Sequence, residues 1–266
     1  SATSTTSATI GFTLAQAGGT VECKVDSGSW GSCTSVSGTS GSMSLTGLTE
    51  GDHSLSVRQT DDDGLVSDVA TAGPWTIDTT SPAAPSLTRT APVSSLTNSD
   101  SATVTFTGEP GASFTCALDG GTYAACASPL GLTELADGSH SVSVKQTDAA
   151  GNTSTASTTS WTVDRTPPAA PSVTRTSPAS ALSNETSASI SISGDQGSSL
   201  LCSIDGGSYA PCGPSPLSLS GLADGLHTVS VKAVDDAGNE SRVHSVTWDV
   251  DTVPHATPVV VLEQPA

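Results

Sequence analysis

A short phrase bounded by two cysteines occurs three times in this chain, at Cys23–Cys33, Cys116–Cys126 and Cys202–Cys212. The two cysteines are the same distance apart in each copy, and a turn sequence of Asp-Gly-Gly or Asp-Ser-Gly and an aromatic residue lie between them. The second and third copies are about 86 residues apart, which is longer than a solenoid repeat of roughly 20–50 residues and long enough for a domain. The phrase therefore predicts a tandem array of small domains.

One cysteine pair per unit predicts one disulfide inside each unit. A zinc site would need four soft ligands close together, and no unit offers a second cysteine pair or a histidine near the first pair. Disulfides persist in oxidising compartments, so we expect a secreted protein. The sequence itself contains no leader-like segment, so we expect any export signal to have been removed or to lie outside it.

The charge of the chain argues against two classes of partner. Its 8 Lys and Arg residues against 26 Asp and Glu residues give a formal net charge of -18. Such a surface repels nucleic acid and anionic membranes. No apolar run reaches the roughly 18 residues of a membrane span, so membrane insertion is not expected either.

The middle unit shows most clearly which secondary structure to expect. Residues 101–107, 113–118 and 140–145 alternate between apolar and polar side chains, and Asp119-Gly-Gly121 has the composition of a hairpin turn. About seven short strands per unit, with no helical periodicity, predict an antiparallel β-sandwich. The hairpin is expected to place Cys116 directly opposite Cys126. The tryptophans that close the units are expected to be core anchors, with exposed sugar stacking as the alternative: Trp75, Trp161 and Trp248.

Four phrases of the unit resemble the bacterial immunoglobulin-like (Ig-like) domain that occurs in tandem in large secreted surface proteins and adhesins. These are Cys-x-[Leu/Ile/Val]-Asp-Gly-Gly-x-Tyr-x-x-Cys, Leu-Ala-Asp-Gly-x-His-x-Val-x-Val, Asp-x-Ala-Gly-Asn, and Trp-Thr-Val-Asp before a proline-rich joint. The resemblance implies an all-β fold of three tandem Ig-like antiparallel β-sandwiches joined by short Pro-rich linkers. It also implies an extracellular location at the bacterial cell surface and a spacer or adhesive role. The first unit departs from the pattern, with Asp61-Asp-Asp-Gly-Leu65 and an insertion between Cys33 and Thr49.

We expect domain 1 at residues 1–79, domain 2 at 80–165, domain 3 at 166–252, and a linker with a first-strand-like segment at 253–266. Domain 1 lacks the first strand that follows each internal joint, whereas the tail has such a strand and no domain after it. Either the sequence is a segment of a longer array, or the tail of one copy completes domain 1 of the next and builds a fibre. The candidate donor strand is Val259, Val260, Val261 and Leu262.

The sequence offers no catalytic constellation, so no enzyme activity is expected. His53, His140 and His227 occupy one equivalent position after a Leu-x-Asp/Glu-Gly corner and are each a whole domain apart. We expect them to be structural, like the corner tyrosine of Ig-like folds, with the polar tip bonded to nearby backbone.

Acidic residues are expected to gather at the joints, where their oxygens suit calcium. The candidates are Asp78, Glu109, Asp148, Asp164, Asp195, Asp235 and Asp236. The alternative is that these residues only form turns, with Arg165 offsetting the linker charge, in which case the protein needs no cofactor.

The function predicted from these patterns is a structural extracellular rod or spacer, whose partners are copies of itself or neighbouring Ig-like domains. The alternative is a glycan- or receptor-binding adhesin module that uses Trp30, which stands where the other units have Tyr123 and Tyr209. Trp30 separates the two hypotheses. An exposed ring beside a groove would favour binding, and a ring packed on the hairpin would favour the rod.

Overall fold

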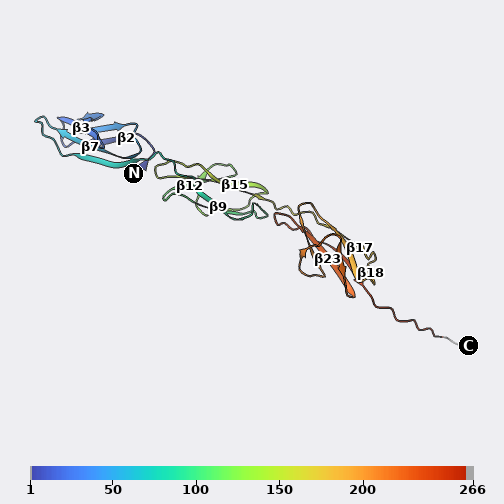
Figure 1. Cartoon of the computed structure of the whole chain (residues 1–266). Coiled ribbons are helices and arrows are strands. Elements are labelled where there is room, and N and C mark those ends of the chain that lie inside the picture. The colour runs from blue at the N-terminus through green and yellow to red at the C-terminus, as the bar shows by residue number, and fades with distance from the viewer. Residues whose placement is uncertain (1, 262–266) are drawn as a thin grey trace. The chain divides into compact units, whose positions relative to one another are not determined.

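The computed structural model describes residues 2–261, and all regular secondary structure in that range is β-strand. The strands fall into three groups along the chain, separated by the strand-free stretches 78–85 and 164–171 (Figure 1). The first group comprises β1 (Ala2–Thr3), β2 (Ala8–Thr13), β3 (Thr20–Val25), β4 (Gly31–Ser32), β5 (Ser35–Ser37), β6 (Ser40–Leu45), β7 (Gly51–Thr60) and β8 (Ala70–Ile77).

The second and third groups keep this order with two differences: a strand is added at the start, and the strand corresponding to β5 is missing. The second group comprises β9 (Ser86–Ala91), β10 (Leu96–Thr97), β11 (Ala102–Thr107), β12 (Ser113–Leu118), β13 (Ala124–Ala125), β14 (Leu130–Leu132), β15 (Gly138–Thr147) and β16 (Ser157–Val163). The third comprises β17 (Ser172–Ser177), β18 (Leu182–Ser183), β19 (Ser187–Ser193), β20 (Ser199–Ile204), β21 (Ala210–Pro211), β22 (Leu217–Ser220), β23 (Gly225–Val234) and β24 (His244–Val250).

Each group forms a five-stranded and a three-stranded sheet. The larger sheets have the orders β1-β8-β7-β3-β4, β10-β16-β15-β12-β13 and β18-β24-β23-β20-β21, and the smaller ones β2-β6-β5, β14-β11-β9 and β17-β19-β22. The predicted all-β architecture of tandem sandwiches is therefore confirmed. By its internal contacts the chain divides into two compact units, and the division runs through the second group. The exact domain boundaries expected from the sequence stay a prediction.

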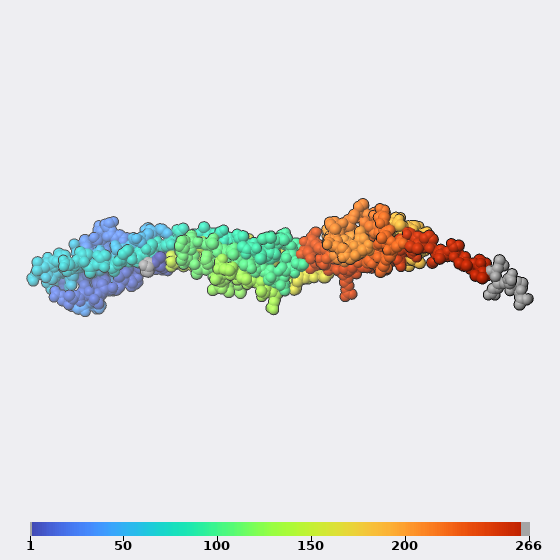
Figure 2. Space-filling model, turned by 90° about the horizontal axis from the view of Figure 1, so that it is seen from below, coloured from blue at the N-terminus to red at the C-terminus, as the bar shows by residue number. Residues whose placement is uncertain are grey.

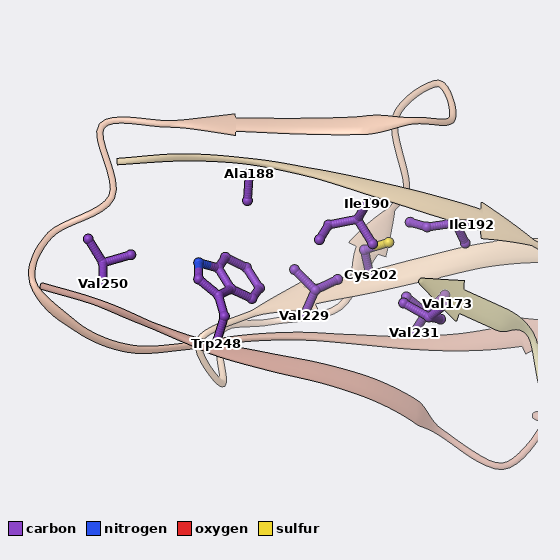
Figure 3. Packing of buried hydrophobic residues seen from close by; sticks show 9 residues of the cluster. All are labelled: Val173, Ala188, Ile190, Ile192, Cys202, Val229, Val231, Trp248 and Val250. Carbon is purple, nitrogen blue, oxygen red and sulfur yellow. The ribbon is translucent and has the colours of Figure 1, made fainter. Parts of the chain in front are cut away.

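The core of the third repeat shows why the alternating pattern gives this fold. Val229 on β23 points into the sandwich between Ile190 of β19 and the ring of Trp248, and Val231 of the same strand lies beside Val173, as Figure 3 shows. All five side chains are buried. Period-two alternation places successive residues on opposite faces of a strand, so one face of each strand supplies this core.

Each cysteine pair is joined in a disulfide, with Cα–Cα distances of 5.1, 5.8 and 5.0 Å along the chain. A bridge that closes so short a loop stabilises the folded chain by about 2–3 kcal/mol in the chain-entropy model. The expected direct opposition of the two cysteines is wrong. Cys116 pairs with Ala124 in the ladder, and the amide of Cys126 bonds to the carbonyl of Phe114, so the bridge runs diagonally.

The diagonal course of the disulfide arises from the turn that lies between the two cysteines. Asp26, Asp119 and Asp205 have positive φ angles of 51°, 50° and 48°. Aspartate tolerates this left-handed conformation better than most residues because its short side chain bonds locally. The loop that follows is then longer than a two-residue hairpin, which shifts the register by two residues.

The segment after the third repeat has no strand pairing among its described residues. Residues 252–261 leave β24 as an extended, exposed stretch, drawn in red in Figure 2. Val259, Val260 and Val261 are 87, 89 and 76% exposed. Leu262, the fourth residue of the expected donor strand, lies outside the described residues.

Candidate functional site

The first repeat has an open side between β2 and β8. Within the described residues, β2 pairs with β6 and with no strand on its other edge. The inward residues of β2 are only half-buried, whereas their counterparts in the later repeats are buried. These inward residues are Ala8, Ile10 and Phe12 in β2, Ala102, Val104 and Phe106 in β11, and Ala188, Ile190 and Ile192 in β19.

A groove follows this open edge, and we call it the acceptor groove. Its lining comes from β2, β7 and β8 and includes Ile10, Phe12, Leu55, Val57, Ala70 and Ala72. It continues past Leu14 and Ala15 beside the end of β2. The lining is mainly apolar, and the free edge of β2 offers unpaired backbone groups. The two features together suit an added β-strand.

The third repeat shows what fills this position. Its first strand, β17, pairs with β19 and also contacts β24, the counterpart of β8. Val173 lies opposite Ile192 in that pairing and is only 6% exposed. In the second repeat, Leu87 of β9 faces Phe106 in the same way. A strand with an inward apolar residue therefore closes the groove in both later repeats.

The start of this strand is held by hydrogen bonds from the last strand of the repeat. Ser157 donates its hydroxyl to the carbonyl of Pro85 at 2.6 Å, and Nδ1 of His244 lies 2.8 Å from the carbonyl of Pro171. The first repeat has Ala70 at this place, which offers no side-chain donor. A strand entering the acceptor groove therefore depends on apolar packing and on the ladder with β2.

The turns expected to bind calcium make hydrogen bonds at the joints. Asn152 donates through Nδ2 to the carbonyl of Asp78 at 2.8 Å, and the amide of Ser4 donates to the carbonyl of Ala150 at 3.0 Å. The same two bonds recur one repeat later. Asn239 donates to the carbonyl of Asp164 at 2.7 Å, and the amide of Asn98 donates to Ala237 at 3.1 Å.

The aspartate carboxylates at the joints accept hydrogen bonds from within their own turns. Oδ1 of Asp148 accepts the amides of Ala150 and Asn152, and Oδ2 accepts Nδ2 of Asn152. These bonds, the one from the Asn152 side chain above all, hold the pKa of Asp148 below its usual value. Burial raises the pKa of Asp235, but the hydrogen bonds from Asn239, Ala237 and Gly238 together outweigh it and the pKa is lowered.

No three acidic, histidine or cysteine side chains gather as a metal site anywhere in residues 2–261. Asp195 accepts the amide of Ala169 in the joint, and Arg165 pairs with Asp137 at 2.9 Å. Calcium at Asp78, Glu109, Asp148, Asp164, Asp195, Asp235 or Asp236 stays a prediction.

Trp30 is half-buried against its own sheet. Its ring centroid lies 4.3 Å from Cζ of Arg58 and 5.0 Å from Nζ of Lys24, and Arg58 is itself paired with Glu22 at 2.7 Å. The later repeats keep this arrangement, with Lys145 over Tyr123 and Lys232 over Tyr209. A cation therefore lies over the aromatic ring at this position in every repeat, and a ligand-binding role of Trp30 stays a prediction.

The three corner histidines lie against the aspartate of the hairpin turn. Nδ1 of His53, His140 and His227 lies 2.8 Å from Oδ2 of Asp26, Asp119 and Asp205 respectively. The sequence interpretation of a polar tip bonded to backbone describes the other nitrogen of His53 and His227, but it missed the aspartate. Every repeat contains both this aspartate and this histidine, and that shared occurrence is the sequence feature that indicates a contact between them.

Residues 85–165 match the family model of the bacterial Ig-like domain. The middle repeat is similar to the bacterial Ig-like domain. The resemblance seen in the sequence is confirmed over this Ig-like repeat.

Among solved structures, the chain is similar to the fibronectin(III)-like modules of Clostridium thermocellum CbhA. The identity is 21%, the match covers 66% of this chain and 100% of that one, and the TM-score is 0.42. No curated protein matches the chain. The described residues include no helix long and apolar enough to cross a membrane.

Proposed function

We propose that this chain is a structural module of a bacterial surface fibre or adhesin and that copies join head to tail by strand donation. The C-terminal segment Val259–Leu262 of one copy enters the acceptor groove of the next. One observation carries the proposal: the groove that β17 closes in the third repeat is open in the first. Ig-like domains are typically non-catalytic, which agrees with a mechanical role.

The tail has the sequence that the groove requires. Aligned on the prolines of the joints, Pro258 corresponds to Pro171, and Val260 corresponds to the buried Val173. Val259 and Val261 then correspond to Ser172 and Thr174, which face solvent. Burying one valine side chain contributes about 1.5–2 kcal/mol, and pairing the free edge of β2 removes an aggregation-prone surface.

An extracellular location is supported by the disulfide in each repeat, since such bonds persist in oxidising compartments. The bonded joints support a spacer role, because each joint is tied by a side chain as well as by the linker. A glycan- or receptor-binding module remains the alternative function. The cation-covered position of Trp30 favours the structural role over this alternative.

Sedimentation and electron microscopy of the full chain test the assembly. We expect filaments from the wild-type chain and none from Val260→Ser, since the inward side chain is lost. Val259→Ser is the matched control, because it replaces an outward valine in the same strand, and it should still assemble. Equal assembly of both variants would overturn strand donation. A wild-type chain that stays monomeric at all concentrations would mean that the groove takes its strand from elsewhere.

A further inference from the structure

The ends that strand donation would bring together differ from the internal joints at two matched positions. In the first repeat the joint turn reads Asp61-Asp-Asp-Gly-Leu65, so Leu65 stands where Asn152 and Asn239 donate to the preceding joint. After the third repeat, Val253 stands where the internal joints have Thr80 and Thr166. Both replacements exchange a polar side chain for an apolar one.

The first-repeat turn keeps the geometry of the internal joint turns. Oδ1 of Asp61 accepts the amides of Asp63 and Leu65 at 3.0 and 2.8 Å, as Asp148 accepts those of Ala150 and Asn152. Leu65 is therefore held at the position of the joint asparagine, with its side chain 71% exposed. It cannot donate a hydrogen bond to a carbonyl as the asparagine does.

The exit of the third repeat keeps its geometry as well. The amide of Val253 bonds to Oδ1 of Asp251 at 2.9 Å, as Thr80 bonds to Asp78 and Thr166 to Asp164 at 3.1 and 3.0 Å. The hydroxyls of the two threonines also bond carboxylates of their own repeat, Glu50 and Asp137. Val253 has no hydroxyl and is 68% exposed.

We infer that Leu65 of one copy packs against Val253 of a second copy, as an apolar joint specific to head-to-tail assembly. This inference rests on the proposed strand donation, which brings the two ends together. In the internal joints the asparagine bonds the carbonyl two residues before the threonine, so head-to-tail joining of the same kind would bring the corresponding leucine and valine near each other. The second joint bond can form unchanged, because it uses only backbone, from Asn184 to Asp63.

The apolar joint also explains how two acidic ends can meet. Asp62 and Asp63 are exposed beside Leu65, where the second repeat has Ala149 and Ala150. Like charges repel at low salt, and this repulsion is screened within about 10 Å at 0.1 M salt. The leucine–valine contact does not depend on salt in this way, so association between copies should strengthen as salt is raised.

A double-mutant cycle on the full chain tests the contact, with association between copies measured by sedimentation. Leu65→Asn and Val253→Thr restore the internal-joint residues, and each should weaken association about tenfold, the loss expected for exposing one such side chain. The double variant recreates an internal-type joint, so its association between copies should be weakened by less than the product of the two single-variant effects. Multiplicative effects of the two changes, or no effect of either, would overturn the contact.

Two controls separate this inference from the proposed function. Val69→Thr replaces an exposed valine of the first repeat outside the joint turn and should not change association. In the second control, binding of a synthetic peptide of residues 252–266 is measured to the full-length Val260→Ser chain, whose own tail is impaired. The measurement is repeated with the control change Val69→Thr added to that chain. Peptide binding with unchanged association of Leu65→Asn would keep strand donation and reject the apolar joint. Absence of peptide binding would reject both.

Discussion

Nδ1 of His227 lies 2.8 Å from Oδ2 of Asp205, and Nε2 of the same ring lies 2.8 Å from the backbone carbonyl of Ala223. His53 has the same pair of acceptors in Asp26 and the carbonyl of Thr49. An imidazole with an acceptor at each nitrogen uses both only when it is doubly protonated. The corner of the fold therefore favours the charged histidine, and this ties the stability of the repeat to pH.

We predict that the chain is most stable in mild acid. The carbonyls of Thr49 and Ala223, followed by the two aspartates, raise the pKa of His53 and His227. Burial raises the pKa of Asp26 and Asp205, but their hydrogen bonds outweigh it and both are lowered. The histidine contribution is complete below about pH 6.5 and is lost as pH rises through the raised pKa. The aspartate contribution is complete above about pH 4 and is lost as pH falls.

Calorimetry should therefore give a higher melting temperature at about pH 5.5 than at about pH 8.5. Replacing both His53 and His227 by glutamine removes the titrating groups and should reduce this difference. A wild-type chain whose melting temperature rises steadily from pH 5.5 to 8.5 would contradict the assignment.

A second prediction concerns the strand that closes the later repeats. Val173→Ala removes a buried side chain between β19 and β24 and should destabilise the third repeat by about 1–2 kcal/mol. Ser172→Ala changes the neighbouring outward residue and should be nearly neutral. Chemical denaturation of the full chain measures both. Equal effects would mean that β17 is not a packed part of the core.

The fold was predictable because every repeat contains alternating apolar and polar residues in its strands and turn residues between them. Alternation in residues 101–107 and 113–118 gave β11 and β12 to within a residue, and proline-rich joints marked the gaps between groups. The joint bonds were not predictable from the turn phrase alone. Asn152 sits in a phrase that forms the same turn whether or not its amide reaches Asp78, and only the three-dimensional arrangement decides that.

The cysteine register failed for a related reason. The turn at Asp119 was interpreted as a tight hairpin, which would place Cys116 opposite Cys126. The aspartate instead takes a left-handed conformation and accepts bonds from His140 and Ser141. A contact between residues about 20 positions apart therefore sets the length of the loop, and local turn preferences do not include it.

A final prediction concerns the joint between the second and third repeats. Nδ2 of Asn239 holds the carbonyl of Asp164, directly before the Arg165–Thr166 bond, and Asn239 is itself buried. Trypsin cleaves after arginine and requires an extended, locally unfolded chain, so cleavage at Arg165 reports how often the joint opens. Asn239→Ala also removes the bond to Asp235 within the turn, but only the bond to Asp164 ties the joint, and losing this bond of about 1 kcal/mol should make the variant about fivefold more susceptible there. Asn184→Ala alters an exposed asparagine of the same repeat and serves as the matched control.

The cleavage rate is measured from the first cleavage product by mass spectrometry under native conditions. Equal rates for the two variants would show that the linker prolines alone restrain the joint, whereas a selective increase for Asn239→Ala would identify its side chain as the tie between the repeats.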